Sequence, residues 1–251
     1  MNLEDWLAAL ALPPATRVGQ RVPKKMLLEH GAPTAADKRV ITDGIKELQW
    51  FAALKPTTIG IPEYRDDTRE YLEIAVLGLS LRPKAKVKRL LELVHRAVPY
   101  PVVLLVMQES EQTLSLCHKR YALNETNKTV LDGEPIEVSQ SSESGRASFD
   151  FLQALAWDRQ PRTDLWALYQ GWADTLLAQK AAALTGTFRP APSPEGAAVR
   201  RGNLYRYQQL ADEIARLRKA ATRESQVARQ VDINLQIQRA LAEQAVLLQG
   251  L

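Results

Sequence analysis

The chain has 251 residues, of which 45% are apolar and 25% charged, so it is large enough to bury a core and is not disordered throughout. No apolar stretch approaches the roughly 18 residues that a membrane-spanning helix needs, which excludes a membrane protein. Acidic residues near the start do not fit an export signal, and the single cysteine, Cys117, excludes an intrachain disulfide. We therefore expect a cytoplasmic protein.

Positive charge is concentrated near the end of the sequence. Residues 197–251 carry nine basic and five acidic side chains, and this excess equals the whole net charge of +4. Such an asymmetry favours an anionic partner, for example DNA or RNA. The alternative is an ordinary solvated helix face.

Residues 1–56 are expected to form a helical, winged-helix-like part. Apolar residues at helical spacing predict a first short helix that ends before two prolines, and a second is predicted over 24–30. A capping box at Thr34 predicts a third helix that reaches Phe51. With the Thr-rich run 57–61 after it, this arrangement resembles a winged helix-turn-helix. The alternative is a packing role, because the last helix is not rich in side chains that read base edges.

Residues 57–138 are predicted to form a small α+β core with a mixed sheet. The run 102–107 is almost wholly apolar, as in a central strand that is buried on both faces. A helix over 83–97 is expected to be the single crossover connection. The further strands are expected at 71–79, 113–123, 128–131 and 135–138, with the second of these forming a hairpin with 102–107.

The remainder is predicted to be mostly helical. A polar loop at 139–148 precedes a helical segment over 149–184, and a Pro-rich linker is expected at 185–202. Residues 203–251 are expected to form one long C-terminal coiled-coil helix, because apolar residues recur there at steps of three and four. A lone helix cannot bury such a stripe, so its partner would be a second copy, an antiparallel neighbour or another protein.

No constellation of catalytic or metal-binding residues is evident. The three histidines lie far apart, and the sequence lacks zinc-binding and phosphate-binding motifs. Cys117 and His118 are adjacent on a predicted strand, where successive side chains point to opposite faces, so they could not share a proton. We expect no catalytic site, no metal and no cofactor.

The enzyme alternative is a divergent Mg²⁺-dependent nuclease. Such a site needs an acid on one strand and an acid two residues before a lysine on the next. Glu73 and Lys119 fit the first and last of these requirements, but Cys117 occupies the position of the second acid.

Two groups of basic residues are candidates for contacts with DNA or RNA phosphates. The alternative for both groups is a solvated surface. They are Lys119 and Arg120 after the predicted hairpin, and Arg216, Arg218, Lys219 and Arg223 in the C-terminal helix.

Three short stretches together resemble an uncharacterised bacterial and archaeal family of unknown function. They are Pro23-Lys24-Lys25, then Val98-Pro99-Tyr100-Pro101, and a C-terminal pattern from Arg223-Glu224 through Gln226, Arg229 and Val231 to Asn234. The resemblance implies a gene placed beside those of helicases and DNA methyltransferases in restriction-like, anti-phage loci. It assigns no chemistry.

These observations predict a non-catalytic accessory subunit that docks through its C-terminal helix to a helicase, to a methyltransferase or to itself. A charged Glu224 on an apolar seam is costly unless it is paired, which favours a role in choosing the partner. The alternative is an internal helical hairpin with the same residues solvated. The expected partner-binding residues are Leu217, Ala221, Glu224, Ala228, Arg229, Val231, Asn234 and Leu235.

Overall fold

The computed structural model describes residues 3–123, 128–140 and 149–251. The chain forms two compact units, a first unit that ends at Leu176 and a second unit over Leu177–Leu251. Most of the expected polar loop, 141–148, lies outside the described residues.

The first unit is built on a six-stranded mixed sheet with the strand order β1-β2-β5-β6-β7-β10. Strands β5 and β6 are parallel, and all other neighbours are antiparallel. This confirms the predicted mixed α+β core. The strands are β1 (Arg17–Arg21), β2 (Ile45–Leu54), β5 (Ile74–Leu81), β6 (Val102–Gln108), β7 (Glu111–Leu116) and β10 (Ile136–Gln140).

Helix α5 (Val87–Ala97) makes the crossover between the two parallel strands. A parallel pair needs such a connection, because its strands run in the same direction. The sheet face of α5 includes Leu90, Leu91 and Val94, which are all buried. Strand β6 then turns directly into β7, and Leu105 pairs with Leu114 in the predicted hairpin.

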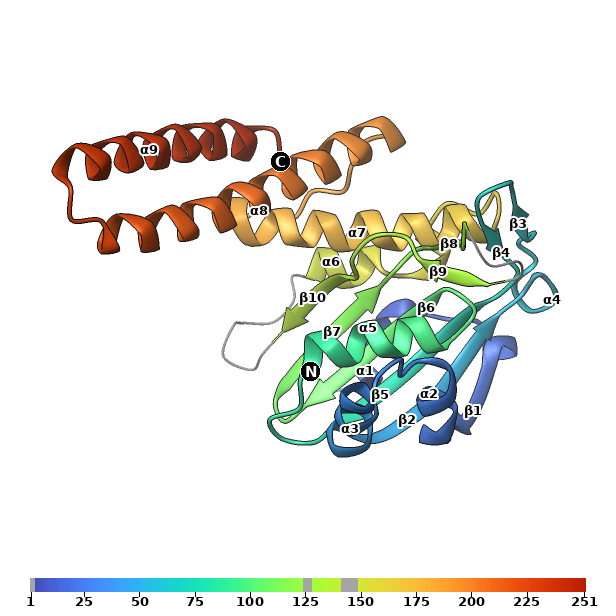
Figure 1. Cartoon of the computed structure of the whole chain (residues 1–251). Coiled ribbons are helices and arrows are strands. Elements are labelled where there is room, and N and C mark those ends of the chain that lie inside the picture. The colour runs from blue at the N-terminus through green and yellow to red at the C-terminus, as the bar shows by residue number, and fades with distance from the viewer. Residues whose placement is uncertain (1–2, 124–127, 141–148) are drawn as a thin grey trace. The chain divides into compact units, whose positions relative to one another are not determined.

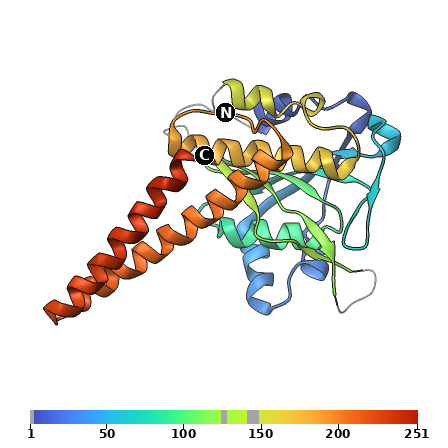
Figure 2. The same ribbon diagram turned by 90° about the horizontal axis from the view of Figure 1, so that it is seen from above.

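Helices cover both faces of this sheet, as Figure 2 shows from above. On one face α2 (Lys24–His30) and α3 (Ala35–Gly44) pack with α5 around a shared apolar cluster. On the other lie α1 (Leu3–Leu10), α6 (Phe149–Ala154) and the first part of α7 (Leu165–Thr185). Trp6 and Phe151 meet edge to face there, at 6.0 Å between ring centroids.

The expectation that residues 1–56 form a separate helical, winged-helix-like part is wrong. Thr34 does cap a helix, since its side chain accepts a hydrogen bond from the Asp37 N–H, but α3 ends at Gly44. Residues 45–54 are strand β2, which pairs with β1 and β5 and so belongs to the same sheet as the core. The Thr-rich run 57–61 was part of the winged-helix interpretation, but its first residues belong to helix α4 (Pro56–Ile59).

Two irregularities explain why β2 resembled a helix in the sequence. The register with β5 shifts between Ile45 and Glu47 and again between Trp50 and Ala52. Each bulge interrupts the simple alternation of inward and outward side chains that identifies a strand. The buried pair Ile45 and Leu48 is consequently spaced by three residues, as on a helix.

Small elements surround one end of the sheet. Two short hairpins are formed by β3 (Tyr64–Arg65) with β4 (Glu70–Tyr71), and by β8 (Lys119–Tyr121) with β9 (Thr129–Leu131). The strand expected over 113–123 is therefore divided between β7 and β8. In the described part of the chain, 3₁₀ helices occur at η1 (Pro14–Thr16) and η2 (Trp157–Arg159).

The second unit contains an antiparallel helical hairpin of α8 (Pro194–Arg223) and α9 (Val227–Gln249). The expected single helix over 203–251 is wrong, because the chain turns back at residues 224–226. The linker expected at 185–202 is also shorter, since Pro194 occupies the first turn of α8 and Ser193 caps it. Proline fits that position because the first N–H groups of a helix have no partner inside it.

Candidate functional site

The hairpin interior uses the first half of the predicted apolar stripe. Leu217 and Ala221 are buried, at 6% and 9% exposure, and Leu217 packs in a cluster with Ile214 of α8 and Ile237 of α9. These two residues therefore do not form part of a free partner-binding surface. The alternative of an internal hairpin is correct for this half of the stripe.

Glu224 does not lie on a coiled-coil seam. It is in the connection between α8 and α9, half-buried, and its carboxylate accepts a hydrogen bond from the Gln226 N–H at 2.9 Å. Its structural role is to hold the turn. The expectation that it is a buried charge awaiting a partner is wrong.

The second half of the stripe is exposed on α9. Val227 is 73% exposed, Val231 51%, Leu235 52% and Val246 67%. At 100° per residue these side chains share an arc of about 100°, opposite the residues that pack on α8. We call this arc the outer face of α9. Its residues are all exposed and uncharged: Val227, Ala228, Val231, Leu235, Gln238, Ala242, Ala245 and Val246.

The outer face is flanked by polar residues. Asp232 and Arg239 are exposed along one edge, seven residues apart, and Asn234 lies at the opposite edge. Arg229 is also exposed, but helical geometry places it away from the outer face. Of the predicted partner-binding residues, Ala228, Val231 and Leu235 thus lie on one surface, with Asn234 beside them.

The four basic residues of α8 that are predicted to contact nucleic acid lie on two different sides of the helix. Arg216, Lys219 and Arg223 are exposed and follow one side of the helix at spacings of three and four. Arg218 is exposed on a different side. The structure therefore places three of the four predicted cations in one row.

Lys119 is not a surface residue. It is 2% exposed, and its ammonium donates hydrogen bonds to the carbonyl oxygens of His95, at 2.5 Å, and of Val98. Those carbonyls are at the C-terminal end of α5, where a cation is favourable because the last carbonyls lack partners within the helix. Burial lowers the pKa of Lys119 to about 8. The expectation that it binds phosphate is wrong.

Arg120 lies between surface and interior. Its Nε is 3.9 Å from Oδ1 of Asp132, and one of its terminal nitrogens donates to the Tyr121 carbonyl at 3.1 Å. The acid beside it offsets the charge that would attract a phosphate. The pair Lys119 and Arg120 therefore does not form the predicted basic surface.

The structure contains only part of the metal site that the nuclease hypothesis requires. Glu73 is 6% exposed, and its Oε2 lies 3.0 Å from Nζ of Lys55. Cys117 occupies the second-acid position, and burial raises the pKa of its thiol to about 12. Within residues 3–123, 128–140 and 149–251, no group of three or more His, Cys, Asp or Glu side chains is placed to hold a metal ion.

A buried polar network that the sequence did not indicate joins α7 to the sheet. The Tyr169 hydroxyl accepts from the Cys117 N–H at 2.8 Å and donates to the Val102 carbonyl at 2.8 Å. Beside it, the Tyr71 hydroxyl lies 2.5 Å from Nδ1 of His118. Tyr169 follows the apolar spacing of α7, so only its contacts distinguish it from an ordinary core residue.

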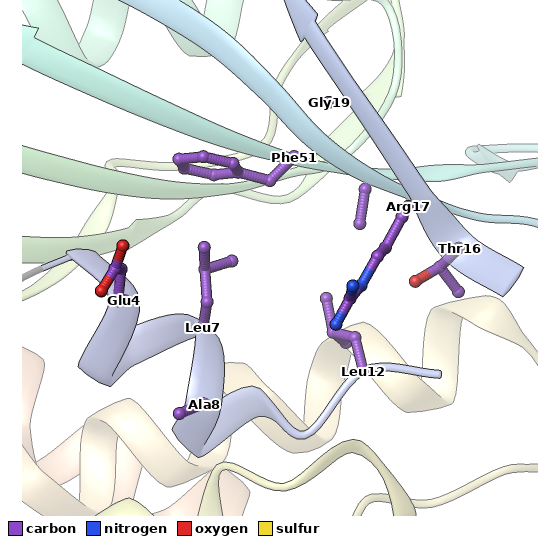
Figure 3. A pocket seen from close by; sticks show the side chains of 9 residues that line it. Glu4, Leu7, Ala8, Leu12, Thr16, Arg17, Gly19 and Phe51 are labelled. Atoms are coloured by element: carbon purple, nitrogen blue, oxygen red, sulfur yellow. The ribbon is translucent and has the colours of Figure 1, made fainter. Parts of the chain in front are cut away.

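An apolar groove of about 410 Å³ lies between α1 and strands β1 and β2. Figure 3 shows the Phe51 ring on one side and Leu7 and Leu12 on the other, with Glu4 and Arg17 at its margins. Apart from these two charged side chains and Thr16, its lining residues are apolar or glycine. A catalytic pocket would need several polar groups that converge on one point.

The described chain is thus an α/β/α sandwich followed by an antiparallel helical hairpin with an exposed, uncharged helix face. Residues 10–243 match the family described as a domain of unknown function (DUF4391), and the protein belongs to this family. No curated protein and no solved structure matches the chain. None of the helices in the described part is both long and apolar enough to cross a membrane.

Proposed function

We propose that this protein is a non-catalytic accessory subunit whose intermolecular contacts are made by the outer face of α9. The observation that carries the proposal is the exposure of Val227, Val231, Leu235 and Val246 along one side of a helix whose opposite side is already packed. Scattered exposed apolar residues are normal, whereas a continuous uncharged stripe marks an interaction surface.

The energetics favour a helix or helical pair as the partner element. Removing a half-exposed Val or Leu from water contributes about 1 kcal/mol, so the stripe supplies a few kcal/mol in total. The alanines at 228, 242 and 245 allow a partner helix to approach closely. Such a surface suits helix-on-helix docking better than binding of a small molecule.

The family resemblance supports a complex with an enzyme that acts on DNA. It implies neighbouring genes for helicases and DNA methyltransferases, so we propose a role in an anti-phage or restriction-like defence complex in the cytoplasm. The C-terminal pattern of the resemblance includes Val231 and Asn234, which lie on and beside the outer face. The partner enzyme would sit on this face directly or bind the protein after it has associated with itself.

Nucleic-acid contact is a further part of the proposal. The row of Arg216, Lys219 and Arg223 is exposed on α8, in the part of the sequence that carries the entire net charge. Cations at these spacings can follow a phosphate backbone without reading its sequence.

The docking proposal is tested with the variant V231E/L235E. The protein is co-expressed with the helicase or methyltransferase that the resemblance implies in the neighbouring genes, and it is purified through that enzyme. We expect the wild type to co-elute and the variant to be lost, because two buried carboxylates cost more than the stripe contributes.

The matched control is Q209E/Q236E, which adds the same charge at exposed positions away from the outer face. It should co-elute like the wild type, and far-UV circular dichroism should show that both variants keep their helices. Co-elution of V231E/L235E at the wild-type level would contradict docking through α9.

A further inference from the structure

We infer that the outer face of α9 is covered by α9 of a second copy of this chain, in antiparallel orientation, so that the two α9 helices pack against each other between the two α8 helices. This inference rests on the proposed docking role of the outer face and names its occupant. It is carried by the spacing of the exposed residues and by the two charges at their edge.

The outer face has the heptad spacing of a helix–helix seam. Alternate steps of four and three join residues of this face that are all exposed. They are Ala228, Val231, Leu235, Gln238, Ala242 and Ala245. The stretch from 228 to 245 is about 26 Å long at 1.5 Å per residue, which gives five turns for contact with another helix.

An antiparallel pairing of this stripe with itself is complementary in size. Two-fold symmetry about the point between residues 236 and 237 places Val231 against Ala242 of the second copy. The same register places Leu235 against Gln238 of the second copy, next to the axis. Each larger side chain thus meets a smaller or flexible one, as interdigitating layers require.

The edge charges select the same orientation. In this register Asp232 and Arg239 of the second copy lie on the same flank of the seam, offset by two residues or about 3 Å along the helix, and the symmetry produces this pair twice. A parallel, in-register pairing would instead place the two copies of Asp232, and likewise the two copies of Arg239, on opposite flanks of the seam beside uncharged residues, so no such ion pair would form. In the part of the chain that the structure describes, both residues are exposed and neither has an ion pair.

The remaining charges do not oppose the pairing. No residue of the outer face is charged, so the seam itself contains no like-charge contact. Glu243, which lies further from the seam, is held by Arg206 of the same chain at 2.6 Å. A seam of this length, rich in alanine, predicts a weak dimer, because it buries much less surface than a standard stable interface.

The test is sedimentation of the full chain over a wide range of concentration. We expect the wild type to change from monomer to dimer, and D232R and R239D each to weaken the dimer at least tenfold. The double variant D232R/R239D should recover the wild-type affinity to within a few-fold, because it restores both cross-pairs with their signs exchanged. Recovery in the double variant distinguishes antiparallel from parallel pairing.

A wild-type protein that stays monomeric at all concentrations, or a dimer that neither charge reversal affects, overturns the inference. Its failure is distinguishable from that of the proposed function. Loss of the partner enzyme in V231E/L235E together with a monomeric wild type supports docking and rejects self-pairing. Conversely, charge-swap recovery with unchanged enzyme co-elution in V231E/L235E supports self-pairing and rejects docking.

Discussion

Lys119 and His95 are titratable residues whose chemistry is decided by burial. The ammonium of Lys119 satisfies two carbonyls at the end of α5, and the His95 ring lies in the same region with Nε2 3.0 Å from Oγ of Ser115. Burial, and then the nearby Lys119 charge, lower the pKa of His95 to about 3. His95 is therefore neutral in the folded protein at neutral pH.

This predicts a loss of stability in acid. An unfolded histidine has a pKa of about 6.5, so between pH 6.5 and 3 the unfolded chain binds a proton that folded His95 does not. The free energy of unfolding should consequently fall as the pH decreases, by about 2 kcal/mol between pH 8 and pH 5 from this residue alone. Urea unfolding followed by tryptophan fluorescence measures the difference.

In the variant H95Q the free energy of unfolding should fall less between pH 8 and pH 5 than in the wild type, because the contribution of His95 is absent. This holds whatever the stability of the variant at pH 8. The control H30Q changes an exposed histidine at the end of α2 and should keep the wild-type difference between the two pH values. An equal pH dependence in H95Q and the wild type would show that His95 is not the group responsible.

At the level of elements, the apolar stripe near the end of the chain was predictable but its division was not. The residues 224–226 contain no proline or glycine that would mark a turn. The stripe could equally have continued along one helix, because its spacing is kept across the break. Only the packing of Leu210, Ile214 and Leu217 against Ile237 determines that the chain turns back there.

The hairpin has its own core, which leads to a prediction about I214A. Ile214 is 4% exposed, and its truncation should cost about 2–4 kcal/mol through lost burial and a cavity. All five tryptophans lie before residue 177, so their fluorescence reports the first unit alone, whereas far-UV circular dichroism reports all helices. We expect part of the circular dichroism signal to melt earlier and the fluorescence transition to stay unchanged.

The control is V199A, because Val199 is 61% exposed on α8 and its truncation should change the stability by no more than about 0.5 kcal/mol. If I214A moves the fluorescence and circular dichroism transitions together, the two units unfold as one and the prediction is wrong.

For the molecule as a whole, the uneven charge predicts salt-dependent binding to nucleic acid. The variant R216E/K219E/R223E removes the row of cations on α8. Each phosphate contact contributes about 0.9 to the slope of log affinity against log salt, so the slope for duplex DNA should fall by about 2–3. Equilibrium binding at several salt concentrations measures it.

A matched control separates position from net charge. The variant K25E/K38E/K46E changes the net charge by the same amount at exposed positions of the first unit. It should reduce the slope far less than the α8 variant. Equal effects of both variants would mean that binding depends on overall charge and not on this row.

The sequence alone determined the features that depend on neighbouring residues. These are the apolar central strand β6, the amphipathic crossover α5, the cap at Thr34 and the unequal charge of the chain. The tertiary structure decided what depends on distant residues: that 45–54 is a strand, that Lys119 is buried, and that one half of the stripe packs internally while the other faces outward. The reason is that burial depends on which surfaces meet after folding, and a periodic pattern states only that a face is apolar.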